Sequence, residues 1–102
     1  MSKSIISNVR KCYKCGTTYD LHKHHIFGGG RRKQSEKYGC WCYLCGKHHN
    51  LSNAGVHFYK PFDLQLKIEC EHKLIYSYGW SIDRFIYTFG RNYFEGEYPG
   101  DY

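Results

Sequence analysis

The sequence lacks an apolar run of membrane-spanning length, and it lacks the apolar stretch and cleavage site of a secretory leader. It also lacks internal repeats and any linker long enough to separate two domains. These absences argue against a membrane protein, a secreted protein and a repeat array. We therefore expect a single soluble domain over residues 1–102, located in the cytoplasm, with its cysteine thiols reduced.

Acidic residues are also few. Nine Asp and Glu residues stand against 15 Lys and Arg residues, which gives a formal net charge of +6 and a sequence pI near 9.0. Such a balance favours polyanionic partners through non-specific attraction. Three of the cations, Arg31, Arg32 and Lys33, follow a run of glycines and are candidates for binding the phosphates of a nucleic acid. A solvated charge run explains them equally well. No base-reading module is recognisable, so we expect weak sequence specificity.

Six cysteines are present, and a domain of 102 residues commonly needs a metal or another staple. Paired cysteines in a reducing compartment bind zinc more often than they form disulfides. Structural zinc takes four tetrahedral sulfur or nitrogen ligands, commonly from two knuckles. The two knuckles predicted here supply Cys12, Cys15, Cys45 and His48.

A second choice of zinc ligands is open, because Cys42-x-x-Cys45 is itself a knuckle. That pair would give an all-thiolate site and would release His48 for other work. We favour His48, since Cys42 falls inside a predicted strand. Cys70 falls in a predicted helix, and we interpret it as a small buried hydrophobic residue.

The local patterns predict a small α+β protein. A polar segment at 1–11 leads into the first knuckle, and a zinc-braced core of two strands and a helix covers about 12–60. A helical extension covers about 61–94, and an acidic tail covers 95–102. The elements expected are strands at 19–27 and 40–44, a loop at 28–39, and helices at 45–53, 63–78 and 82–89. Ser81 and Gly90 have the residue types that begin and end the last helix.

Six histidines remain after the predicted zinc site is filled, and four of them are candidates for chemistry: His24, His25, His49 and His57. His22 and His72 are less clearly placed. Hydrolysis of a phosphodiester needs a base that deprotonates water and a cation that neutralises charge on the phosphate. A histidine with a pKa near neutrality suits the first task. One or two further histidines could hold a divalent ion for the second.

These residues resemble a known family. His24-His25-Ile26, a glycine-rich loop and Leu44-Cys45-x-x-His48-His49 are similar to the HNH endonucleases, the ββα-metal or His-Me finger nucleases. More narrowly, the chain resembles small phage and prophage members with an L-x-K-H-H-I-F strand and an L-C-x-x-H-H-N helix start. The nearest of these are the phage recombination-enhancement nucleases. The resemblance covers about residues 12–57. It implies a zinc-braced ββα domain with C-terminal helices that cuts DNA with one Mg²⁺ or Mn²⁺ ion, in a bacterial or phage-infected cell.

The resemblance also implies residue roles. His25 matches the general base, His24 the first ligand of the catalytic ion, and His49 the ligand at the helix start. His57 matches the last ligand, at a wider spacing than compact members have. The family asparagine that usually precedes the Leu-Cys element is absent from Gly39-Cys40-Trp41-Cys42. A backbone carbonyl or Asn50 would then orient His25.

Two alternative functions follow from the same residues. A non-catalytic zinc module could bind nucleic acid or a phage or host protein, and the missing asparagine favours that interpretation. A small inhibitor or adaptor built on a decayed nuclease is a third. A metal-dependent nicking assay separates both from an endonuclease.

Overall fold

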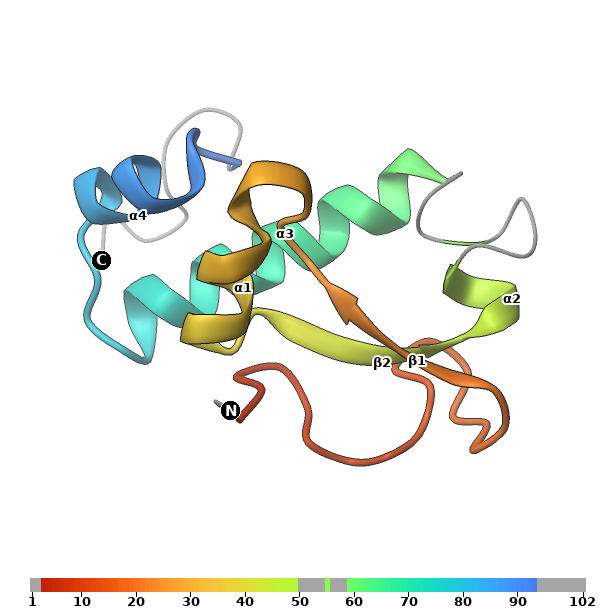
Figure 1. Ribbon diagram of the computed structural model, residues 1–102. Helices are drawn as coiled ribbons and strands as arrows, with labels where there is room; N and C mark the ends of the chain where they lie inside the picture. The colour runs from red at the N-terminus through yellow and green to blue at the C-terminus, as the bar shows by residue number, and fades with distance from the viewer. Residues whose placement is uncertain (1–2, 50–54, 56–58, 94–102) are drawn as a thin grey trace.

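The computed structural model describes residues 3–49, 55 and 59–93. It is a small α+β structure, as the sequence predicts, with one two-stranded sheet and several helices. The long helix α3 runs between the short helix α2 at one end of the molecule and α4 at the other (Figure 1). Within the described residues no helix is both long and apolar enough to cross a membrane. The elements in chain order are β1 (Leu21–His25), the 3-10 turn η1 (Gly29–Arg31), α1 (Arg32–Tyr38), β2 (Trp41–Cys45), α2 (Gly46–His49), α3 (Lys60–Tyr76) and α4 (Ile82–Phe89).

The two strands pair antiparallel, with Leu21 opposite Cys45 and His25 opposite Trp41. β1 is shorter than the strand predicted at 19–27, and β2 is shifted by one residue from the strand predicted at 40–44. Since successive side chains of a strand point to opposite faces, His22 and His24 lie on one face of β1. β2 ends at Cys45, so α2 begins directly after a predicted zinc ligand.

The predicted loop at 28–39 is wrong, because residues 32–38 form the helix α1. Its sequence is polar and buries only Ser35, so it lacks the apolar periodicity that identifies a helix. Ser35 attaches the helix to the end of β1. Its hydroxyl donates to the carbonyl of Phe27 (2.8 Å) and accepts from the amide of Phe27 (2.9 Å). Gly39 ends the helix with a left-handed φ of 76°.

The C-terminal helices agree closely with their predictions. α3 begins at Lys60, earlier than the predicted start at 63, because Pro61 fits the first turn of a helix. α4 has the predicted bounds of 82–89, with the Ser81 hydroxyl accepting from the amide of Arg84 (3.0 Å) and Gly90 at a φ of 94°. Cys70 is fully buried in α3, as expected.

The predicted N-terminal tail packs against the domain. Ser4 is buried, and its hydroxyl donates to the carbonyl of Trp41. The amide of Ile5 donates to the carbonyl of Gly39 (2.9 Å), and the side chains of Ile5 and Ile6 pack on the core. This segment therefore covers the start of β2 and leads into the first cysteine pair.

Candidate metal centre and histidine cluster

The structure brings together the four predicted zinc ligands. Cys12 and Cys15 lie on a turn before β1, Cys45 ends β2 and His48 lies in α2. One ligand atom from each lies within 4.8 Å of the others. A tetrahedral zinc ion with ordinary bond lengths places two sulfurs about 3.8 Å apart and a sulfur and a nitrogen about 3.6 Å apart. The Cys15–Cys45 Sγ distance is 3.8 Å, and His48 Nδ1 lies 3.7 Å from Cys12 Sγ and 3.4 Å from Cys45 Sγ. The group can therefore hold a metal ion such as zinc.

The electrostatics of the sulfurs also suit a cation. Burial alone would raise the pKa of Cys12, but backbone N–H groups of Cys45, Cys15 and Lys14, with the His48 side chain, lower it from 9.0 to about 6. The pKa of Cys45 is raised, first by burial and then by the neighbouring Cys12 and Cys15. Three adjacent thiols do not all ionise readily unless a cation offsets their charge.

The alternative knuckle through Cys42 does not fit this geometry. Cys42 lies inside β2 and is fully buried, and it is not one of the four clustered ligands. Burial, followed by the nearby Cys12 and Glu69, raises its pKa to about 12. Cys42 is therefore a neutral thiol in the core.

A cluster of histidines lies beside this candidate metal centre. The His49 ring is in contact with two rings of β1, at centroid distances of 5.3 Å to His24 and 5.0 Å to His22. His22 Nδ1 lies 2.8 Å from His49 Nδ1, and His22 Nε2 lies 3.1 Å from Asp20 Oδ1. Because a carboxylate only accepts, His22 Nε2 is the donor to Asp20. Either ring can be the donor across the Nδ1–Nδ1 contact of His22 and His49, according to its tautomer.

No role was predicted for His22 or Asp20. The signal that could have found them is the alternation His22-x-His24, which places two imidazoles on one face of a strand. His57 and Asn50 lie outside the described residues.

The three described histidines of the predicted catalytic site line one cavity. It has a volume of about 270 Å³, and its lining includes His24, His25, His49 and Arg32. An adjoining cavity of about 440 Å³ shares His24 and His25 and adds Lys60, Asp63 and Lys67 of α3. Asp63 and Lys67 pair at 2.9 Å. A phosphate in this space would meet imidazole nitrogens and several cations.

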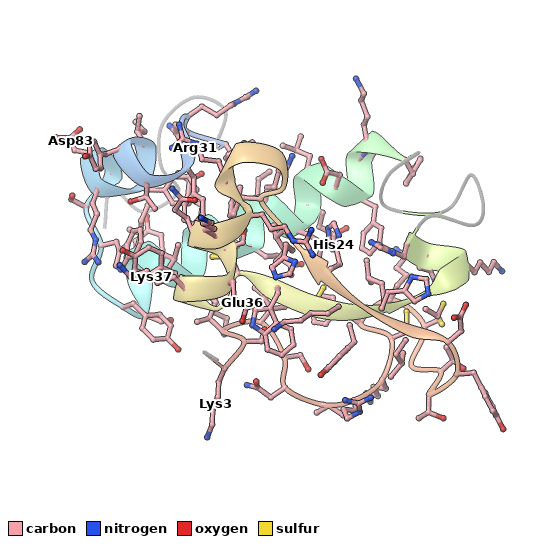
Figure 2. All side chains as sticks on the ribbon, in the orientation of Figure 1. Lys3, His24, Arg31, Glu36, Lys37 and Asp83 are labelled. Carbon is pink, nitrogen blue, oxygen red and sulfur yellow. The ribbon has the colours of Figure 1, made fainter. Side chains whose placement is uncertain are left out.

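Among the described residues, the side chain that contacts His25 is a carboxylate, a partner that was not predicted. The predicted role of Asn50 stays a prediction. His25 Nε2 lies 2.8 Å from Glu36 Oε1, and Lys23 Nζ lies 2.8 Å from the same oxygen. Hydrogen bonds from Lys23 and then from His25 hold the pKa of Glu36 below its usual value. Figure 2 labels Glu36 on α1 and His24. Glu36 is the only acidic residue between Asp20 and Asp63 in the sequence. This isolation is the signal that could have identified it as a partner of His25.

The three predicted phosphate-binding residues lie in different surroundings. Arg32 lines the histidine cavity. Lys33 lines a neighbouring cavity that also contains His25 and Glu36. Arg31 faces the other way, and its Nη1 donates to the carbonyl of Thr88 near the end of α4 (3.1 Å).

No protein-family model, characterised protein or solved structure matches this chain.

Proposed function

We propose that this protein is a metal-dependent DNA endonuclease of the HNH type, which hydrolyses phosphodiester bonds with a histidine base and one divalent ion. The observation that supports this most is the convergence of His24, His25 and His49 on one cavity, with Glu36 against His25. A general base needs an orienting partner and an open space for its water, and this arrangement offers both.

In the proposed mechanism, Glu36 accepts a hydrogen bond from the protonated Nε2 of His25. The other ring nitrogen, Nδ1, is then unprotonated and takes a proton from water. The resulting hydroxide attacks phosphorus in line, and the bond to the 3′ oxygen breaks, which leaves a 5′ phosphate as the resemblance implies. Arg32 lies in the same cavity and would offset charge on the phosphate.

The donor set of the catalytic site consists of imidazoles from His24 and His49, with His57 added by the resemblance. Imidazole ligands suit Mn²⁺ better than Mg²⁺, which prefers oxygen. The ion would supply a Lewis acid for the phosphate and for the leaving oxygen. We therefore expect Mn²⁺ to support faster cleavage than Mg²⁺.

The Cys12, Cys15, Cys45 and His48 group is proposed to hold a structural zinc ion. Four protein ligands would fill a tetrahedral ion and leave no position for substrate. Its contribution is positional, because His48 precedes His49 directly and Cys45 ends the strand that pairs with β1.

The test is nicking of supercoiled plasmid by zinc-loaded protein with added Mn²⁺ or Mg²⁺. The wild type should nick with either ion, and His25→Ala should be slower by a factor of about 10²–10⁴. Lys73→Ala, on the exposed side of α3, is the matched control and should behave as the wild type. Absence of metal-dependent nicking by the wild type, or equal nicking by His25→Ala, would contradict the proposal and favour a non-catalytic zinc module.

A further inference from the structure

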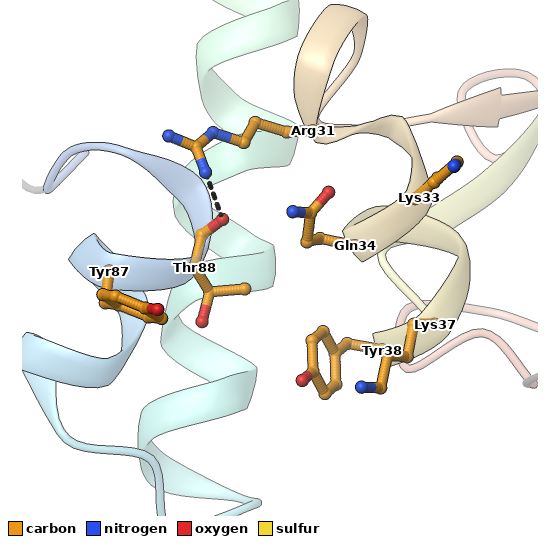
Figure 3. Close-up of a pocket in the computed structure, with 7 residues that line it drawn as sticks. All are labelled: Arg31, Lys33, Gln34, Lys37, Tyr38, Tyr87 and Thr88. Carbon is orange, nitrogen blue, oxygen red and sulfur yellow. Dashed lines mark hydrogen bonds between the residues drawn. The ribbon is translucent and has the colours of Figure 1, made fainter.

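A basic groove lies between α1 and α4. It has a volume of about 550 Å³, and Figure 3 shows the side chains that line it. Residues four apart on a helix share a face, so Arg32 and Glu36 occupy the face of α1 near His25. Gln34 and Tyr38 are on a different face of α1, and they line the groove. The groove is therefore separate from the histidine cavity.

The charge of this groove is of one sign. Arg31, Lys33 and Lys37 line it, and no acidic residue does so among the described residues. Arg31 is fixed in place by its hydrogen bond to the carbonyl of Thr88. Hydrogen bonds from Arg84 and then from Lys37 hold the pKa of Tyr38 below its usual value, which reflects the same positive field. The groove is suited to a ligand with more than one negative charge.

The groove also carries an aromatic ring with no role in the core. Tyr87 of α4 is 87% exposed, whereas its neighbours Phe85 and Phe89 are buried. On the opposite wall, the buried amide oxygen of Gln34 accepts no hydrogen bond from the described part of the chain. An exposed ring beside several cations is the arrangement by which proteins bind single-stranded nucleic acid, with bases stacked and phosphates paired.

We propose that the groove between α1 and α4 binds a single-stranded segment of DNA, with its phosphates on Lys33 and Lys37 and a base stacked on Tyr87. Lys33 also lines the cavity that contains His25 and Glu36, so one strand can extend from the groove to the candidate site. The choice of DNA rests on the proposed function. The substrate would then contain a single-stranded stretch next to the bond that is cut.

The test is fluorescence anisotropy of a short labelled single-stranded DNA, without added Mg²⁺ or Mn²⁺. Tyr87→Ala should weaken binding about 5- to 150-fold, the usual effect of losing one base–aromatic stack. Tyr87→Phe keeps the ring and should bind within about twofold of the wild type. Tyr19→Ala is the matched control, because Tyr19 is also highly exposed (81%) and does not line the groove. Zinc content and circular dichroism confirm that each variant is folded.

A second variant tests the phosphate contacts. Lys37→Ala should reduce the slope of log affinity against log salt by about 0.7, the value for one phosphate of a single strand. Lys73→Ala should leave the slope unchanged.

Wild-type affinity for Tyr87→Ala would overturn the proposal, as would equal losses for Tyr87→Ala and Tyr87→Phe. Tighter Tyr87-dependent binding to a duplex, or to RNA of the same sequence, would also overturn it. The assay needs no cleavage and is repeated with His25→Ala. Tyr87-dependent binding without nicking would count against the endonuclease alone, and nicking without such binding would count against the groove alone.

Discussion

The contact between Glu36 and His25 gives a sharp prediction about catalysis. Glu36→Gln retains the size of the side chain and removes its charge. The 2.8 Å contact is a charge-assisted hydrogen bond, which contributes about 1.5–3 kcal/mol when it is shielded from water. Because the Glu36 side chain is 34% exposed, we take the lower part of that range, about 1.5–2 kcal/mol. If that energy orients the base in the transition state, kcat falls about 10- to 30-fold.

The assay is multiple-turnover nicking of supercoiled plasmid, with the substrate concentration varied so that kcat and KM separate. We expect kcat to fall and KM to stay unchanged, since Glu36 orients His25 without a contact to the DNA. Lys73→Ala is the control. Lys73 is exposed and does not line the histidine cavity, and we expect a change in kcat of less than about threefold. A Glu36→Gln variant with normal zinc content and kcat within twofold of the wild type would refute the role of Glu36.

Three further predictions concern the scaffold. Cys45→Ser should bind less than one zinc per chain, as measured by atomic absorption, whereas Cys42→Ser should keep the wild-type content because Cys42 is not in the cluster. With a pKa of about 12 and no exposed surface, Cys42 should resist iodoacetamide at pH 8 in the zinc-loaded protein and react once a chelator unfolds it, as mass spectrometry would detect. Gly39→Ala should lower the unfolding free energy by about 2–5 kcal/mol, because a Cβ there would overlap the carbonyl of Lys3 at a left-handed φ. Gly79→Ala has the same φ sign and open space, so it should cost only about 1–2 kcal/mol by urea denaturation.

Features that depend on residues close together in the sequence, such as ligand spacing and helix caps, could be predicted from the sequence. The spacing Cys12-x-x-Cys15 and Cys45-x-x-His48 predicted four candidate metal ligands, and the fold brings their ligand atoms within 4.8 Å of one another. The bounds of α4 followed from Ser81, which supplies a side-chain acceptor at its start, and from Gly90, which adopts a positive φ at its end.

The helix α1 could not be predicted in the same way. It is short, follows three glycines and buries only Ser35, so its stability comes from tertiary contacts rather than from an apolar face. Two of these contacts are the hydrogen bonds between Ser35 and Phe27. Phe27 lies outside the helix, so no pattern within residues 32–38 indicates these bonds. Missing this helix meant missing Glu36, whose approach to His25 depends on it. The predicted role of His57 stays a prediction.

The most direct test of the central claim is the rate of plasmid nicking by one zinc-loaded sample before and after addition of Mn²⁺. We expect no nicking before the addition and nicking after it, with the rate lost in His25→Ala at unchanged zinc content. Nicking that is absent after the addition, or that persists in His25→Ala, would contradict the claim that the cavity of His24, His25 and His49 cleaves DNA.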